Sequence, residues 1–437
     1  MRAASIACAH DDTPKYYHPG ARNGDEANTC PMAQTQRQWA RCDAEWYLPT
    51  DVLVQEPSFE VYIGALGPVT SLFQGTFDTR RATIEHRSFV EQLERHHIRV
   101  HRLSDAVLKG TRDRFGRVID GPPLQALRSL ARSSLTYDAT GLPAENRAEV
   151  RRLWDETILK LGPEELFLSI VIRPTFYFQL SEVPNSGYNH RCQIDPQSNL
   201  TFVRDQQIIT PNGLVLGKLN SVQRRHEVAL TKLALANLDV KPFYELSGSD
   251  SRMEGGDYLP CMEYCMIWQG LRTNELGVKE LLDNHVFGCP EVVVIKDPWQ
   301  NQDQMHVDTW INMVGPRLAV CVGERLVDPI LIPKVDTYRD RDGRYRLERR
   351  DEPFPDFLQR KRIEIIPITM RDQERFGVNY LCIGDRHIIG VNGQGEAYRT
   401  MLRKHGVRAS WVDLPNLSRA WGALHCCVQA LRRVPAR

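Results

Sequence analysis

The chain contains no apolar run of about 18 residues, the length that a helix needs to cross a membrane. It has no excess of either charge, since 56 lysines and arginines stand against 55 aspartates and glutamates. We therefore expect neither nucleic acid nor a membrane as a partner. Residues 1–6 lack a long apolar core, and Asp11 and Asp12 follow, so we expect neither a secretory nor a transit signal.

The cysteines also lack a pattern. There are eleven, an odd number, without the spacing of a disulfide framework, which is typical of a reduced, cytoplasmic protein. Cys8, Cys30 and Cys42 lie near the N-terminus, but their spacing fits no zinc motif, and we expect no metal.

The sequence has 437 residues, of which 42% are hydrophobic. A chain of this length and composition can bury a sizeable hydrophobic core. Residues 1–48 show no periodicity, and we predict a disordered tail there and a folded domain over 49–437. Within the domain, we predict strands at Val52–Val54 and Phe59–Ile63, a helix capped by Asp78, and a helical insertion over 105–165.

From about residue 198 the chain repeats the order strand, strand, helix, strand at intervals of about 50 residues. The copies begin near Asn199, Glu254 and Asn379. The polar residues Asp205, Glu254 and His306 are also separated from one another by about 50 residues. Because repeats arranged in a circle bring equivalent positions to one centre, we predict an α/β fold in which these residues meet.

Cys426, which follows the small residues Gly422 and Ala423, is the candidate nucleophile, and Cys427 is the alternative. A thiolate attacks carbon only when a base or a cation stabilises its ionised form. The carboxylates elsewhere in the chain would oppose that ionisation if they lay beside the thiol. A cationic substrate would resolve the conflict by bringing its own positive charge.

His306 and Asp308 lie in a predicted strand over His306–Ile311, where alternation places both on one face. Glu254 and Asp257 flank two glycines. Taken singly, these residues fit a polar strand edge and a turn, and arginines such as Arg224 fit a solvated surface. Only their joint occurrence, in this order, points to a shared site.

That order resembles the arginine deiminase family of the guanidino-group-modifying (amidinotransferase) superfamily. The resemblance covers roughly residues 50–432 and is carried by Asn199 to Asp205, Arg224 to Glu227, Glu254 to Asp257, Gly270 to Thr273, His306 to Asp308, and His425-Cys426. It implies a five-bladed, pseudo-symmetric propeller of ββαβ units with a small helical insertion. It also implies hydrolysis of L-arginine to L-citrulline and ammonia through a covalent amidino-cysteine, without a cofactor.

The resemblance further implies roles for individual residues. Asp205 and Asp308 would hold the guanidinium beside Cys426, because carboxylates accept its N–H groups in pairs. His306 would act as acid and then as base, oriented by Glu254. The expected substrate-binding residues, some of which would grip the α-carboxylate and others form the wall of the site, are Asn199, Phe202, Arg224, Asp257 and Arg272.

One position departs from the bacterial pattern, which has a third arginine five positions before the nucleophile. Here that position is Trp421, and Arg419 is a nearby candidate to replace it. Two alternatives stay open: an amidinotransferase, in which an amine takes the amidino group, and a homologue that binds arginine without catalysis. The sequence also leaves open an assembly of identical chains.

Overall fold

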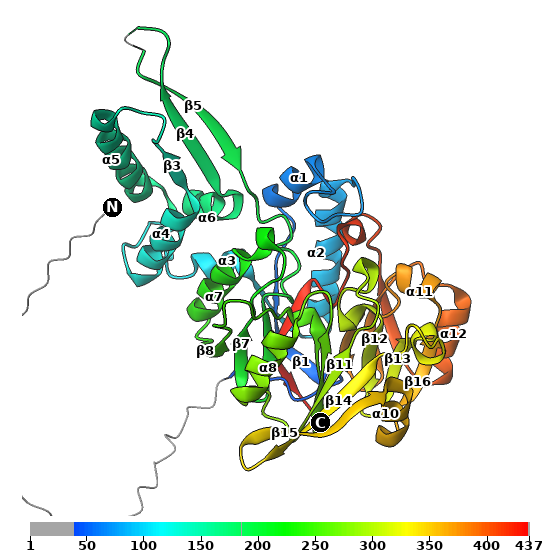
Figure 1. The fold of residues 1–437 in the computed structure, drawn as a ribbon. Coiled ribbons are helices and arrows are strands. Elements are labelled where there is room, and N and C mark those ends of the chain that lie inside the picture. The colour runs from blue at the N-terminus through cyan, green and yellow to red at the C-terminus, as the bar shows by residue number, and fades with distance from the viewer. Residues whose placement is uncertain (1–38, 185, 436–437) are drawn as a thin grey trace, which may run out of the picture. The chain divides into compact units, whose positions relative to one another are not determined.

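The computed structural model describes residues 39–184 and 186–435. Five small sheets share one arrangement there, in which the middle strand pairs antiparallel with one neighbour and parallel with the other. A helix always leads from the middle strand to the parallel one, as a parallel connection requires. We call each sheet with its helix a ββαβ unit (Figure 1).

The first, second and fourth units match the three repeats found in the sequence. The first consists of β6 (Gln207–Thr210), β7 (Gly213–Leu216), α7 (Glu227–Asn237) and β8 (Pro242–Glu245). The second consists of β9 (Tyr258–Pro260), β10 (Tyr264–Gln269), α8 (Glu275–Asp283) and β11 (Glu291–Lys296). The fourth consists of β17 (Leu381–Gly384), β18 (His387–Val391), α12 (Glu396–Lys404) and β19 (Arg408–Val412).

The third unit is interrupted by a hairpin that joins the sheet of the second. It consists of β12 (Ile311–Gly315), β13 (Leu318–Val322), α10 (Phe354–Lys361) and β16 (Glu364–Ile368). The short helix α9 (Glu324–Val327) and the hairpin of β14 (Lys334–Arg341) and β15 (Arg344–Pro353) lie between β13 and α10, and β14 pairs with β11. The helix α11 (Met370–Glu374) leads into the fourth unit.

The fifth unit joins the two ends of the described chain. It consists of β20 (Val428–Val434), β1 (Leu48–Val54), α2 (Thr79–Arg95) and β2 (Arg99–Arg102). Asp78 caps α2 as predicted, since its carboxylate accepts hydrogen bonds from the backbone N–H groups of Arg80 and Arg81. The predicted strand Phe59–Ile63 is wrong, because these residues form the helix α1 (Phe59–Leu66). Short apolar runs do not distinguish the two structures.

Residues 39–47, which we placed in the tail, belong to the fold. Ala44 and Trp46 are buried, and the backbone N–H groups of Arg41 and Glu45 donate to carbonyls of residues 431 and 260. The boundary predicted at residue 48 is therefore too late. Residues 1–38 of the predicted tail lie outside the described residues. No helix in the described part of the chain is long and apolar enough to cross a membrane.

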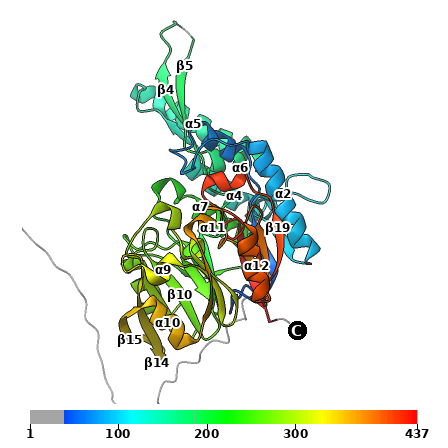
Figure 2. The same ribbon diagram turned by 90° about the vertical axis from the view of Figure 1, so that its right-hand side faces the viewer.

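The predicted helical insertion is present but larger, and it includes a sheet. Its helices are α3 (Leu103–Leu108), α4 (Pro122–Ser134), α5 (Ala144–Lys160) and α6 (Pro163–Ile172). A sheet of β3 (Thr136–Asp138), β4 (Pro174–Leu180) and β5 (Tyr188–Ile194) completes it. Figures 1 and 2 both show β4 and β5 projecting from these helices. The predicted boundary at 165 is wrong because β4 is only partly buried and β5 is largely exposed, so neither strand has a clear apolar alternation.

Candidate active site

The candidate catalytic residues occupy equivalent places in the ββαβ units. Asp205, Glu254, Asp308 and Cys426 each lie two to four residues before the first strand of a unit, in the first, second, third and fifth units respectively. The corresponding residue of the fourth unit is Asn379, two residues before β17. Sequence analysis missed Asn379 as a site residue, although the repeat that it recognised at this position could have identified it.

His306 lies among carboxylates at this centre. Its Nε2 atom is 2.9 Å from Oε2 of Glu254, and its Nδ1 atom is 3.7 Å from Oδ1 of Asp205. Burial alone would lower the pKa of the imidazole, but the charges of Asp205, Asp257 and Glu254 outweigh it and raise the pKa of His306 to about 10. The same pairing, together with Arg272, outweighs burial at Glu254 and lowers its pKa to about 2.

The backbone that follows His306 differs from our prediction. Instead of a strand over His306–Ile311, a 3₁₀ turn runs from Val307 to Thr309, and β12 begins only at Ile311. His306 and Asp308 nevertheless both face the centre. Gly256 permits this arrangement, because a Cβ atom there would lie 2.6 Å from Nδ1 of His306.

Asp205, Glu254 and His306 also offer ligand atoms within 4.8 Å of one another, a spacing compatible with a metal ion. An imidazole binds a metal only through a nitrogen that carries no proton. Since the pKa of His306 is raised to about 10, both of its nitrogens are protonated near neutral pH. A metal ion at these three atoms would therefore have to displace a proton from His306, which the raised pKa of the imidazole opposes.

The Cys426 thiol is buried beside two polar side chains. Its Sγ atom is 3.9 Å from Oδ2 of Asp308 and accepts a hydrogen bond of 3.2 Å from Nδ2 of Asn379. Burial, followed by the charges of Asp308 and Asp205, raises the pKa of Cys426 well above that of a free thiol. The candidate nucleophile is therefore a neutral thiol in the absence of a neighbouring positive charge.

A narrow cavity, with about 320 Å³ of space when its open mouth is included, opens onto this thiol. Its lining includes most of the predicted residues, namely Asn199, Phe202, Asp205, Arg224, Arg272, His306 and Cys426, together with Leu72, Gln302, Met305, Ala420 and Trp421. Glu254, Asp308 and Asp257 do not line it. The Oδ2 atom of Asp257 accepts a hydrogen bond of 2.6 Å from Thr273, whose hydroxyl also accepts from the backbone N–H of Glu254. Asp257 thus braces the loop that carries Glu254.

Several acceptor atoms at this centre have no hydrogen-bond partner in the described structure. They include Oδ1 of Asp205 and Oδ1 of Asp308, both buried. A buried acceptor without a donor costs free energy, so such atoms mark a place that a ligand completes. Two carboxylate oxygens beside a thiol suit a ligand with several N–H donors.

The two arginines predicted to bind the carboxylate differ in whether their guanidinium groups are already paired with carboxylates of the protein. Arg224 is buried and already paired, 2.7 Å from Oδ2 of Asp205 and 2.9 Å from Oε2 of Glu227. Arg272 donates to Oε1 of Gln302 at 3.1 Å and contacts Sδ of Met305 at 3.3 Å, and its Nε atom has no partner. Arg272 is therefore the arginine available to an anion.

Arg419, the predicted replacement for the missing arginine, is exposed and does not line the cavity. It lies in a separate surface hollow with Arg375 and Arg399. Trp421 lines the cavity itself and adopts a left-handed backbone conformation with φ of 64°.

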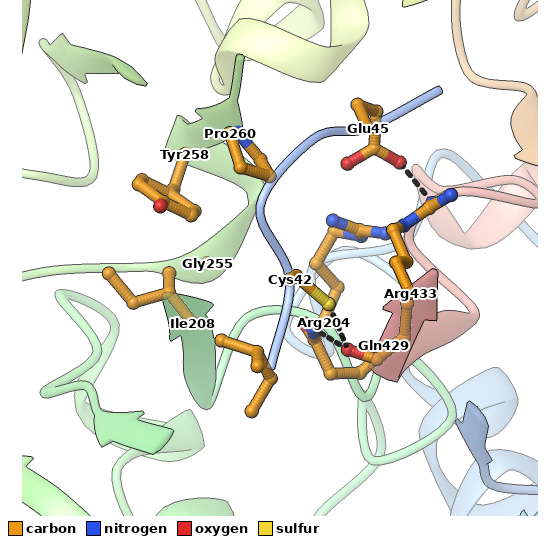
Figure 3. Close-up of a pocket in the computed structure, with 11 residues that line it drawn as sticks. Cys42, Glu45, Arg204, Ile208, Gly255, Tyr258, Pro260, Gln429 and Arg433 are labelled. Carbon is orange, nitrogen blue, oxygen red and sulfur yellow. Dashed lines mark hydrogen bonds and ion pairs between the residues drawn. The ribbon is translucent and has the colours of Figure 1, made fainter. Parts of the chain in front are cut away.

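Behind Cys426, its neighbour His425 links two carboxylates. Its Nδ1 atom is 2.6 Å from Oδ2 of Asp308, and its Nε2 atom is 3.1 Å from Oε1 of Glu45. Arg433 pairs with the same Glu45 oxygen, as Figure 3 shows, and the charges of Arg433 and His425 outweigh burial and lower the pKa of Glu45 to about 2. Glu45 falls within the predicted tail, where we expected no site residue.

Comparison with known proteins identifies the family of the chain. The model of the family described as arginine deiminase matches residues 70–433. The arginine deiminase of Halobacterium salinarum is 24% identical over 90% of this chain and 96% of its own. The arginine deiminase of Listeria monocytogenes is 26% identical over 58% of this chain and 68% of its own.

Solved structures share the fold at low identity. The N-terminal domain of ArgZ, an arginine dihydrolase of cyanobacteria solved with bound substrate, is 12% identical with a TM-score of 0.53, over 88% of this chain and 98% of that one. A dimethylarginine dimethylaminohydrolase adduct is 12% identical with a TM-score of 0.51, over 87% and 99%. The fold is thus the mixed α/β fold of the amidinotransferase superfamily, and the chain belongs to the arginine deiminase family of hydrolases acting on C–N bonds.

Proposed function

We propose that the protein hydrolyses L-arginine to L-citrulline and ammonia through a covalent intermediate on Cys426. The observation that carries the proposal is the pair of buried acceptors without partners, Oδ1 of Asp205 and Oδ1 of Asp308, beside a neutral thiol. A guanidinium is planar, cationic and rich in N–H donors, so it would satisfy both carboxylates. Its charge would also stabilise the Cys426 thiolate.

In the first half of the reaction, the thiol releases its proton as the guanidinium binds, and Sγ attacks the central carbon. The His306 imidazolium then donates a proton to one terminal nitrogen of the neutral tetrahedral adduct. The C–N bond breaks, ammonia leaves, and a cationic amidino-cysteine remains. The raised pKa of His306 supports this role, since the residue begins the cycle protonated.

In the second half, neutral His306 takes a proton from a water molecule that attacks the amidino carbon. The second adduct collapses, its hydroxyl proton leaves, and the C–S bond breaks to give citrulline and the thiolate. Glu254 keeps His306 oriented and protonated through the 2.9 Å contact. The donor from Nδ2 of Asn379 stabilises the negative charge that the sulfur carries before the attack and again after the C–S bond breaks.

The remaining predicted residues bind the rest of the substrate. Arg272, free of carboxylate partners, holds the α-carboxylate, and Asn199 and Phe202 form the wall beside the aliphatic chain. Arg224 fixes Asp205 rather than gripping substrate directly, because its guanidinium is already bound to Asp205 and Glu227. Asp257 supports the Glu254 loop through Thr273.

We also propose that the units form the closed five-bladed propeller that the resemblance implies, as one catalytic domain. Contacts between successive units support closure: β9 with the turn before β12, β12 with β17, β17 with β1, and β20 with β6. The first and second units meet where Lys218 bridges Met253 and the N–H of Gly255 donates to the carbonyl of Asp205. A cytoplasmic location stays a proposal based on the free cysteines.

The test is to incubate the purified protein with L-arginine and measure citrulline and ammonia. We expect both in equal amounts, and mass spectrometry after an acid quench should find an amidino adduct on Cys426. Release of ornithine with transfer of the amidino group to an added amine would instead identify an amidinotransferase. Arginine binding without any product would indicate a binding protein.

A further inference from the structure

A fully buried arginine, Arg325, contacts the chain on both sides of residues 306–308, the segment that carries His306 and Asp308. It lies in the short helix α9, which Figure 2 labels. On one side, its Nε atom donates a hydrogen bond of 2.7 Å to Oε1 of Gln304, two residues before His306. On the other side, its Cζ atom is 5.2 Å from the ring centroid of Trp310, two residues after Asp308. One guanidinium group therefore touches both ends of this segment.

Arg325 is held in place by a buried ion pair. Its Nη1 atom is 2.9 Å from Oδ1 of Asp297, and both side chains are fully buried. The Asp297 carboxylate also accepts hydrogen bonds from the backbone N–H groups of Trp299 and Gln300, at 3.0 and 2.8 Å. Charge-assisted hydrogen bonds are stronger than neutral ones, so this pair fixes the position of the guanidinium.

Three tryptophans enclose the same guanidinium. Besides Trp310, the ring centroids of Trp268 and Trp299 lie 5.2 and 5.4 Å from Cζ of Arg325. Trp268 lies in β10 of the second unit, whereas Trp310 directly precedes β12 of the third. A planar guanidinium is attracted to aromatic faces and can still donate hydrogen bonds from its edge. The orientation of Arg325 is therefore set by rings from two units.

The two side chains of segment 306–308 depend on accurate placement. Nε2 of His306 is 2.9 Å from Oε2 of Glu254, and Oδ2 of Asp308 is 3.9 Å from Sγ of Cys426. Such distances are set by the backbone that carries the side chains. A misplacement of about 1 Å at an active site can lower the rate about 100-fold. The contacts that Arg325 makes at both ends of the segment hold this backbone.

We propose that Arg325 is a positioning residue, which holds both ends of segment 306–308 and so keeps the imidazole of His306 and the carboxylate of Asp308 in place for the reaction. The inference rests on the proposed function, because it takes these two side chains to act on the substrate. Arg325 does not line the cavity that opens onto Cys426, so it acts through its neighbours in the fold and not on the substrate. Lysine in its place would keep the positive charge but lose the planar fork and the stacking.

The first test compares Arg325→Lys with a matched control. We expect Arg325→Lys to lower kcat for L-arginine by roughly 10- to 100-fold, the usual effect of losing a residue that orients an active-site group. Arg360 is also paired with a carboxylate, through hydrogen bonds of 2.9 and 2.7 Å to Glu352, and its Cζ atom lies 5.4 Å from the ring centroid of Phe357. It does not line the cavity, so Arg360→Lys should leave kcat within about 2-fold, even if it lowers the melting temperature. Equal falls in kcat in the two variants would overturn the positioning role.

Gln304→Met tests the same contact from its other partner. It removes the acceptor of the Arg325 Nε–H group and keeps a side chain of similar length, so kcat should fall as it does in Arg325→Lys. Because both substitutions act on one contact, the double variant should lose less than the product of the two single losses. A loss equal to that product, or an unchanged kcat in Gln304→Met, would overturn the proposed link. Circular dichroism spectra verify that the variants are folded.

The second test does not need turnover. Nitrogen-15 NMR spectra of histidine-labelled protein follow the titration of His306, whose signal is assigned by its absence in His306→Gln. The charges of Asp205, Asp257 and Glu254 raise the pKa of His306 to about 10. Because this effect weakens with distance, the midpoint in Arg325→Lys should lie at least about one pH unit lower, and an unchanged midpoint would overturn the positioning role. If wild type forms no citrulline, the proposed function fails, while this titration still decides whether Arg325 positions His306.

Discussion

Nδ1 of His425 lies 2.6 Å from Oδ2 of Asp308, so the residue next to the candidate nucleophile holds the carboxylate that faces its thiol. The imidazole is itself held by Glu45, which reaches the centre from the N-terminal segment and pairs with Arg433 (Figure 3). The active site thus depends on a residue that lies far from it in sequence and does not touch the cavity.

We predict that Glu45→Gln lowers kcat by roughly 10- to 100-fold, the usual effect of losing a group that orients an active-site residue. KM for L-arginine should change less, because the binding residues stay in place. Steady-state kinetics of Glu45→Gln and the conservative Glu45→Asp would show this, with Glu45→Asp recovering part of the rate. An equal fall in both variants, matched by a fall in melting temperature, would indicate a purely structural role.

Substitutions of the adjacent residues Cys426 and Cys427 should have very different effects on activity. Cys426→Ala should lower kcat by more than about 1,000-fold, since no other group can carry the covalent intermediate. Cys427→Ala should retain most activity, because Cys427 does not line the cavity, and burial raises the pKa of its thiol. Citrulline assays on both variants decide the assignment, and activity surviving only in Cys426→Ala would reassign the nucleophile.

Substitution of Arg224 should mainly lower the stability of the protein, whereas substitution of Arg272 should mainly weaken substrate binding. Arg224→Gln leaves the buried carboxylates of Asp205 and Glu227 without their cation, so we expect a loss of about 3–5 kcal/mol in unfolding free energy. Arg272→Gln should instead raise KM for L-arginine at least 10-fold with a small change in stability. Denaturant unfolding and steady-state kinetics of both variants measure the contrast, and similar effects from both would contradict it.

The contribution of His306 to the stability of the folded protein should decrease as the pH rises. Its pKa is about 10 in the folded protein and about 6.5 when unfolded, so its contribution is complete below pH 6.5 and is lost as the pH rises towards 10. The slope from this group alone is at most about 1.4 kcal/mol per pH unit. Unfolding free energies between pH 7 and 9 should therefore fall less steeply for His306→Gln. An identical slope in both proteins would mean that His306 is neutral in the folded state.

Most of the chemistry was recognisable from local sequence. The repeat of strand, strand, helix and strand identified the first, second and fourth units, because each unit has its own apolar periodicity. It also indicated that Asp205, Glu254 and His306 converge, since equivalent positions of a repeat meet at one centre. The third unit was hidden by its inserted hairpin, and the fifth by the separation of β20 from β1 in the chain.

What the sequence determined by itself was the inventory of reactive groups: a thiol, an imidazole and carboxylates in an order that resembles one family. Tertiary structure decided how they are paired. Only the folded chain brings Glu45 to His425, and only packing shows that Arg224 is already neutralised while Arg272 is available. The physical reason is that charge pairing and burial depend on distances between distant segments, which local composition and periodicity do not encode.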